Sequence, residues 1–113
     1  MAITIVFLKQ VDPNSTVTLT WKAPRDGKIV SIDFTFYYTK NLLKVYVTLD
    51  TTLNVITYAT GSEEYVALHE KSVTLYCDKQ FQKGDTITVK AINEDTDPNG
   101  KHWLTAFVNV ELL

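Results

Sequence analysis

Cysteine and net charge are both scarce in this chain. Its 113 residues include one cysteine, Cys77, and 11 basic against 13 acidic residues leave a formal net charge of −2. A lone cysteine excludes an internal disulfide, so packing, contacts between copies or a ligand must hold the fold together. The near-neutral balance lacks the basic footprint that nucleic acid or an anionic membrane attracts. We therefore expect no nucleic-acid partner.

Long hydrophobic runs are also missing. The apolar stretch from Ile3 to Leu8 is too short to span a bilayer, so no membrane insertion is expected. The first residues have neither the basic region nor the small-residue cleavage site of a signal peptide, and we expect none. With 45% hydrophobic residues, however, the chain has enough apolar surface for a core. Its length favours one domain, residues 1–113.

Helical periodicity is absent, and alternation of apolar and polar residues takes its place. No stretch of a dozen residues repeats its apolar positions at helical spacing, whereas β-branched and aromatic residues recur at every second position. All three prolines fall in turn-like separators between the alternating segments. This pattern predicts an all-β, antiparallel, jelly-roll-like sandwich of about eight or nine strands, with an immunoglobulin-like sandwich as the alternative. The expected strands are 3–9, 16–22, 29–38, 42–49, 53–59, 64–68, 72–78, 85–92 and 102–112.

Alternation also assigns the faces of these strands. In the third segment it places Val30, Ile32, Phe34, Phe36 and Tyr38 on one face. The residues predicted to lie in the core are Trp21, Ile32, Phe34, Phe36, Val45, Val47, Leu75, Val89, Val108 and Val110.

Two segments are apolar on both faces, which a strand buried on one side does not need. The candidate residues of an interface or ligand platform, all predicted to point outward, are Trp103, Phe107, Tyr37, Tyr46, Val6 and Leu8. A partner subunit, a flanking loop or a bound sugar would each cover such a surface.

Motifs for catalysis are absent. The chain has no nucleophile elbow, no glycine-rich phosphate loop and no paired cysteines, and its two histidines, His69 and His102, lie far apart in sequence. Cys77 alternates with buried positions and reads as a small hydrophobic residue. We expect no enzyme activity, no catalytic residue and no cofactor.

One loop offers oxygen ligands. Asp95, Asp97 and Asn99, followed by Gly100, match the first half of a calcium loop. The second half fails, because the position of its bidentate acid is taken by Ala106. A solvated turn is the favoured interpretation, no metal is expected, and these three residues remain weak candidates.

Two stretches resemble the jelly-roll domains of phage and archaeal-virus structural proteins. The first, residues 23–32, carries a Pro-x-Asp-Gly-x-Ile turn that opens a core strand. The second, residues 81–89, carries a Gly-Asp-x-Ile-Thr-Val hairpin that precedes the final strand, 104–112. The resemblance covers roughly half of the chain and implies a non-catalytic structural or attachment role, in a virion or in the cytoplasm.

Together these observations predict a viral or phage-like structural or attachment module that self-associates. A homotrimer follows from the resemblance, and a homodimer follows from the frequency of two-fold closure. Other virion proteins or a surface glycan are further expected partners. The alternative function is a carbohydrate-binding or other ligand-recognition module, and the fold class alone does not decide between the two.

Overall fold

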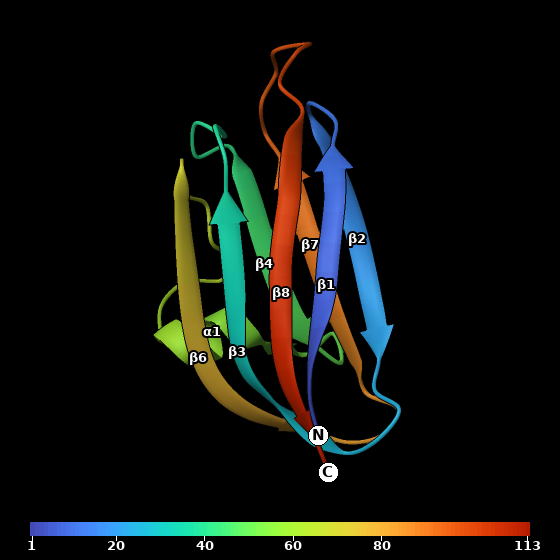
Figure 1. The fold of residues 1–113 in the computed structure, drawn as a ribbon. Coiled ribbons are helices and arrows are strands. Elements are labelled where there is room, and N and C mark those ends of the chain that lie inside the picture. Colours follow the sequence, from blue (N-terminus) through green and yellow to red (C-terminus); the bar gives the residue numbers. More distant parts are fainter.

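The computed structural model describes residues 1–113 and contains eight strands and one short helix (Figure 1). The elements in chain order are β1 (Ala2–Val11), β2 (Ser15–Lys22), β3 (Gly27–Phe36), β4 (Leu43–Leu49), β5 (Leu53–Asn54), α1 (Val55–Thr60), β6 (Lys71–Phe81), β7 (Thr86–Asn93) and β8 (His102–Leu112).

The strands form two antiparallel four-stranded sheets that pack face to face. Their orders are β1-β8-β3-β6, called here the first sheet, and β2-β7-β4-β5, the second sheet. The pairs β1–β8, β2–β7, β3–β6 and β4–β5 are those of one long ribbon of chain folded back on itself and rolled into two layers. This is the jelly-roll order, so the predicted architecture is confirmed. The immunoglobulin alternative is wrong, because it places the first two strands in one sheet.

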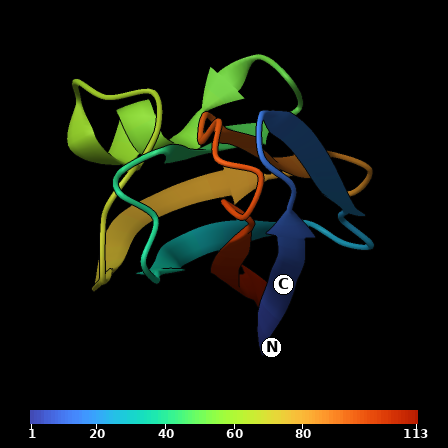
Figure 2. The ribbon, with the colours of Figure 1, turned by 90° about the horizontal axis from the view of Figure 1, so that it is seen from above.

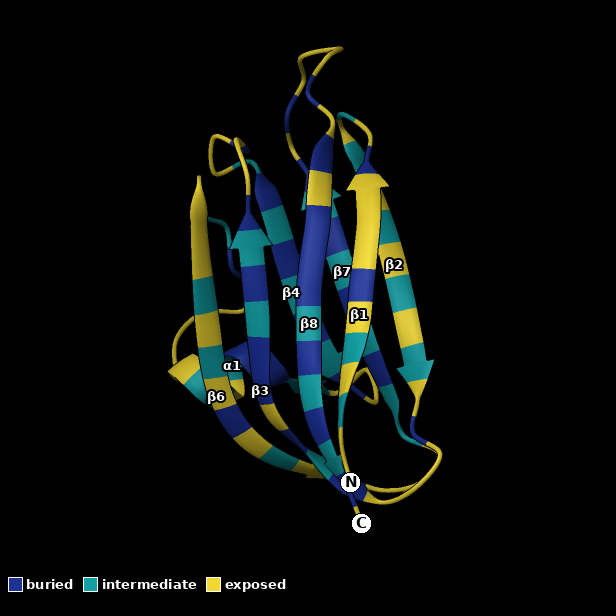
Figure 3. Cartoon of the chain, in the orientation of Figure 1, coloured by how far each residue is buried: buried dark blue, intermediate teal, exposed yellow.

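The core lies between the sheets and is built by strict alternation along most strands. In β4 and β7 every second residue is buried, and the residues between are half-buried. Of the ten predicted core residues, eight are buried, and Trp21 and Leu75 are partly buried against them. Figure 3 shows this alternation as bands of buried and more exposed residues along the strands.

The face assignment of β3 is wrong at its two ends. A register shift between Ile29 and Ser31 makes a β-bulge, so Ile29 is buried and Val30 is exposed. An extra residue reverses the alternation from that point, which a period of two cannot anticipate. Tyr38 lies beyond the end of β3 and is exposed, with its ring against His69 at a centroid distance of 4.6 Å.

The strand predicted over 53–59 is wrong, because most of it forms α1. The Asn54 side chain accepts a hydrogen bond from the Thr57 amide, which caps the helix N-terminus. Gly61 ends the helix in the left-handed region, at φ 80°. Val55 and Ile56 are fully buried, so burial outweighs the strand preference of these β-branched residues.

The strand predicted over 64–68 is also wrong. This segment is a loop that touches β4 through a single bridge between Val66 and Val45. Together with α1 it covers the flank of the sandwich between β6 and β4, whereas the opposite flank, between β1 and β2, has no covering element (Figure 2). No helix of the chain is long and apolar enough to cross a membrane.

Candidate functional site

The outer face of the first sheet gathers five of the six residues proposed as an interface or ligand platform. In the register of β1 and β8, Val6 lies opposite Phe107, and Gln10 lies opposite Trp103. Leu8 is paired with Thr105 between them, and Tyr37 follows the end of the neighbouring strand β3. Figure 3 shows exposed segments side by side near one end of β1 and β8. The sheet order therefore joins segments that are about 100 residues apart in sequence.

A shallow hollow of about 370 Å³ lies at that end of the face. Its lining residues are Leu8 from β1, Trp103 and Thr105 from β8, and Tyr37. Leu8, Tyr37 and Trp103 are 54%, 54% and 44% exposed, although all three are large and apolar or aromatic. Neither aromatic ring is stacked on another ring of the chain. The hollow therefore presents two free aromatic surfaces to solvent.

Thr105 distinguishes the hollow from an ordinary apolar depression. Thr105 is only 7% exposed, and its hydroxyl oxygen has no hydrogen-bond partner in the chain. It is the one buried side-chain polar atom for which this holds. A buried hydroxyl without a partner is costly, so such a group calls for an explanation.

A row of polar side chains borders the apolar part of the face. Thr4 donates to Asn109 at 2.8 Å, and Asn109 donates to Asp33 at 2.9 Å. Thr74 donates to the other oxygen of Asp33 at 2.5 Å. These four residues come from β1, β8, β3 and β6, so the row crosses the whole sheet. The polar groups on this half of the face are already satisfied by one another.

Tyr46, the sixth proposed residue, lies elsewhere. It belongs to β4 in the second sheet, where its ring packs on Tyr65 at 5.5 Å and lies under the Lys90 ammonium at 4.7 Å. These contacts cover it within its own chain. The structure therefore does not bring Tyr46 together with the other five residues.

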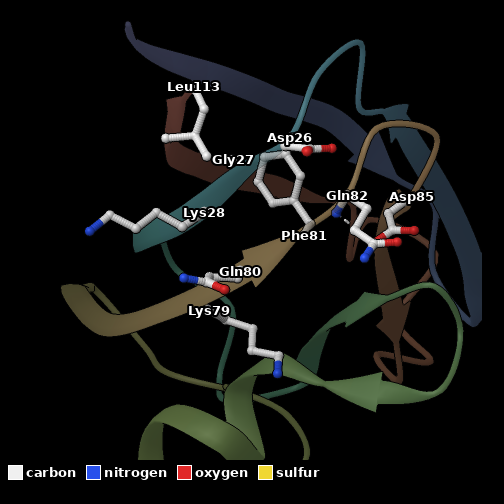
Figure 4. A pocket seen from close by; sticks show the side chains of 9 residues that line it. All are labelled: Asp26, Gly27, Lys28, Lys79, Gln80, Phe81, Gln82, Asp85 and Leu113. Atoms are coloured by element: carbon white, nitrogen blue, oxygen red, sulfur yellow. Dashed lines mark hydrogen bonds between the residues drawn. The ribbon is translucent and has the colours of Figure 1, made fainter.

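The pocket with the largest volume lies at the opposite end of the molecule, and most of its lining residues are polar or charged (Figure 4). It has a volume of about 680 Å³ and is lined by Asp26, Gly27, Lys28, Lys79, Gln80, Phe81, Gln82, Asp85 and Leu113.

The charged groups of this pocket are engaged in structural contacts. Asp26 and Asp85 accept backbone hydrogen bonds from Lys83 and Gln82. The Lys28 ammonium pairs with Asp78 at 3.1 Å, and the ammonium of a second lysine lies over an aromatic ring of α1. This pocket thus lacks a free charged side chain that points to a ligand.

The oxygen ligands proposed for a metal are also used within the chain. Side-chain oxygens of Asn93, Asp95 and Asp97 each accept the backbone N–H two residues on, at 2.9–3.0 Å, which makes a series of turns. No group of three or more histidine, cysteine or acidic residues is placed to hold a metal ion. The metal-site interpretation of Asp95, Asp97 and Asn99 therefore gains no support, and the loop is a structural one.

Asp95 and His102 form the most deeply buried hydrogen bond between an acidic side chain and a histidine, with 2.9 Å between Oδ2 and Nε2. The pKa of the Asp95 carboxyl is held below its ordinary value, first by the hydrogen bond from the Asp97 amide and then by the His102 side chain. Asn93 donates to the carbonyls of Val11, Asp12 and Gly100, which ties this loop to the β1–β2 turn. The predicted solvated turn is therefore wrong for Asp95, which is buried and, with Asn93 and His102, fastens one end of the sandwich.

Cys77 is buried, and burial raises the pKa of its thiol. Its sulfur lies 3.5 Å from the Ile29 carbonyl at the bulge of β3. A thiol in this state is a packing group and not a reactive one.

Comparisons with known proteins identify the fold and no family. No family model and no curated protein matches the sequence. Among solved structures, the crystal structure of FLHE has a TM-score of 0.52 at 8% identity, over 97% of this chain and 93% of that one. A chain of infectious bursal disease virus, Gt strain, has a TM-score of 0.51 at 11% identity, over 97% and 31%. The clostridial cysteine protease Cwp84 has a TM-score of 0.52 at 12% identity, over 97% and 40%.

At 8 to 12% identity these likenesses concern the fold alone. The chain spans less than half of the virus and protease chains that it matches. The chain is thus a β-sandwich module of the jelly-roll type, similar to parts of larger proteins.

Proposed function

We propose that the chain is a non-catalytic structural or attachment module of a viral or phage-like assembly, and that it associates with a second copy of itself through β1. The observation that carries this proposal is the free, uncharged edge of β1. The jelly-roll order supports the viral setting, because this architecture recurs in viral capsid proteins.

Most of the edge of β1 lacks the usual protection against pairing, since its only charged residue, Lys9, lies near one end. β1 has ten residues, stands at the end of the first sheet, and carries no charged side chain from Ala2 to Leu8. Long edge strands in soluble proteins are normally blunted by charges, proline, bulges or covering elements. At the other end of the sheet, β6 has charged residues at Lys71, Asp78 and Lys79 and a left-handed residue at Asp78. Of the two edges of the first sheet, β1 is therefore the one better suited to add a strand.

Pairing of β1 with β1 stops at two copies. One edge of β1 is bonded to β8, and an antiparallel pair of identical strands is two-fold symmetric, so each free edge is used once. The two first sheets then become one continuous sheet of eight strands. With the two strands centred on Val6, this side chain would meet its copy on the outer face, and Phe107, which pairs with Val6 across β1 and β8, would flank the contact. This geometry favours a dimer over the trimer expected from the resemblance.

Sedimentation equilibrium tests the proposal. The unmodified chain is expected at twice 12.8 kDa at high micromolar concentration. Val6→Lys places a charge at the centre of the shared edge and is expected to yield the monomer. Tyr76→Lys, at an exposed position on β6 of the same face, is the matched control and is expected to leave the dimer intact. A monomeric unmodified chain, or equal effects of the two lysines, would contradict the proposal.

Backbone hydrogen exchange adds a second measurement. Amides of β1 that face the free edge are expected to become protected as the protein concentration rises, since they gain partners only in the dimer. Amides of β6 should show no such dependence.

A further inference from the structure

The hollow formed by Leu8, Tyr37, Trp103 and Thr105 has properties that self-association does not explain. Pairing of β1 edges extends the first sheet sideways and leaves its outer face open, so the hollow stays accessible in the dimer. We propose that this hollow is a binding site for one uncharged saccharide ring, stacked on Trp103 and hydrogen-bonded to the Thr105 hydroxyl. This site is independent of the proposed self-association.

The aromatic surfaces set the shape of the ligand. Trp103 and Tyr37 are about half exposed; Trp103 belongs to β8 and Tyr37 directly follows the neighbouring strand β3, with Leu8 of β1 on the other side of Trp103. A ligand that covers them needs an apolar face of about the size of one ring. The volume of about 370 Å³ is near the lower limit for small-molecule sites, which favours a single ring over an extended chain.

Thr105 sets the polarity of the ligand. Thr105 lines the hollow, and its hydroxyl is buried without a partner, so a ligand reaches this hydroxyl when the Thr105 side chain turns toward the hollow. A wholly apolar occupant would leave it unsatisfied. An occupant with a hydroxyl at its rim would supply the missing hydrogen bond. Gln10 lies directly opposite Trp103 on β1, where its amide adds a donor and an acceptor beside the hollow. A pyranose combines these two requirements, since its C–H groups form an apolar face and its hydroxyls form a polar rim.

Charge excludes the competing classes of ligand. None of the four lining residues is ionisable at neutral pH, so the hollow offers no counter-charge to a carboxylate, a phosphate or an ammonium group. Sialylated or sulfated sugars are therefore expected to bind no better than their neutral counterparts. An aromatic side chain of a protein partner would fill the apolar part of the hollow and leave Thr105 unpaired, unless it carried a hydroxyl.

One variant tests the site through opposite effects on stability and on binding. Thr105→Val removes the unpaired hydroxyl and keeps the shape of the side chain. Without ligand, we expect it to be at least as stable as the unmodified chain in urea unfolding, because it removes an unsatisfied polar group. In the presence of a neutral oligosaccharide that binds the unmodified chain, we expect its affinity to fall about tenfold, the usual effect of one lost hydrogen bond of about 1.4 kcal/mol.

The binding experiment is a neutral glycan array followed by titration of Trp fluorescence with the oligosaccharides that bind. Trp103→Ala is expected to abolish binding, and Tyr76→Ala, a 77% exposed tyrosine on β6 of the same face, is expected to leave it unchanged. Phenol serves as the probe for a simple hydroxyl-bearing aromatic ring.

Each outcome supports or overturns the proposal. Saccharide binding that is lost in Trp103→Ala and weakened in Thr105→Val supports it. No binding to any neutral glycan at millimolar concentration overturns it, as does binding of phenol alone or binding that ignores both variants. A clear loss of stability in Thr105→Val would mean that the hydroxyl is already satisfied, which removes the main argument. Val6→Lys separates this proposal from self-association, because it is expected to break the dimer and leave saccharide binding in place.

Discussion

The two flanks of the sandwich differ in what closes the gap between the sheets. On the β6 flank, α1 and the following loop close the gap between the sheets, and Val55 and Ile56 of the helix are fully buried. On the β1 flank no element crosses the gap (Figure 2). The two sheets are joined there at one end only, through the hydrogen bonds that Asn93 of β7 donates to the β1–β2 turn. One flank is thus held by apolar burial and the other by a buried polar network.

This difference gives the two flanks separate roles. The covered flank protects the sheet edge near it and carries many apolar contacts. The open flank leaves a long strand edge free, which is where an interaction between copies costs the fold least. Four predictions test this division of roles, in order of decreasing effect.

The largest effect is expected from the covered flank. Ile56→Ala should lower the free energy of unfolding by about 2–5 kcal/mol, since it leaves a cavity under α1. Val6→Ala on the open flank should change it by less than about 0.5 kcal/mol, because Val6 is exposed. Urea unfolding of both variants, at a concentration low enough for monomers, measures the contrast. Similar losses at the two positions would contradict the division.

The next effect concerns pH and belongs to the open flank. Because the pKa of Asp95 is lowered in the folded state, its contribution to stability is complete above the ordinary carboxyl pKa of about 3.9. That contribution is lost as the pH falls through the lowered value. The melting temperature should therefore drop on acidification, and amides of the β1–β2 turn should exchange faster before those of α1 do. Asp95→Asn should be less stable at neutral pH and should show a flatter dependence on acid pH.

The helix cap offers a smaller change on the covered flank. Asn54→Ala removes the side chain that accepts from the Thr57 amide and should cost about 1 kcal/mol. Asn54→Asp keeps the acceptor but loses the hydrogen bond that the Asn54 amide donates to the Glu64 carbonyl at 3.0 Å, so it separates the cap from this second bond. If both variants lost the same stability, the cap would not be the cause.

The smallest effect is expected for Lys79, whose ammonium lies 5.4 Å from the Tyr58 ring centroid. Lys79→Gln should cost about 0.5 kcal/mol, typical of an exposed contact between a cation and an aromatic ring. In a Tyr58→Leu background the same substitution should be neutral. A loss that persists in that background would assign the effect to another contact of Lys79.

Alternation predicts most of the fold from sequence and fails where the period is broken. It places Phe34, Val47 and Val108 in the core, where the structure has them. It misses the bulge at Val30, because an inserted residue leaves no mark in composition. It also reads residues 53–59 as a strand, although Asn54 and Gly61 stand at the cap positions of a short helix. The two cap residues can be recognised in the sequence, but the β-branched residues between them led to the prediction of a strand.

The candidate site was predictable only in part. The outward direction of Trp103 and Leu8 follows from alternation within each strand. Their proximity depends on the pairing of β1 with β8, which no local pattern reports, and the same limit led to the grouping of Tyr46 with residues of the other sheet. Thr105 could not be selected, since its unpaired hydroxyl is a property of the packed neighbours and not of its own position in sequence.

The pairing of β1 with β8 has a consequence for how the protein is made. Residue pairs such as Ala2 and Glu111 join the two ends of the chain, so the first sheet closes only after β8 has left the ribosome. Non-local pairings of this kind fold slowly. During synthesis β1 therefore has no partner strand on either edge until β8 has been made, although its sequence is uncharged up to Leu8. Such a segment is prone to aggregate, and the rate at which β8 arrives, rather than the stability of the finished sandwich, should set the yield of soluble protein at high expression.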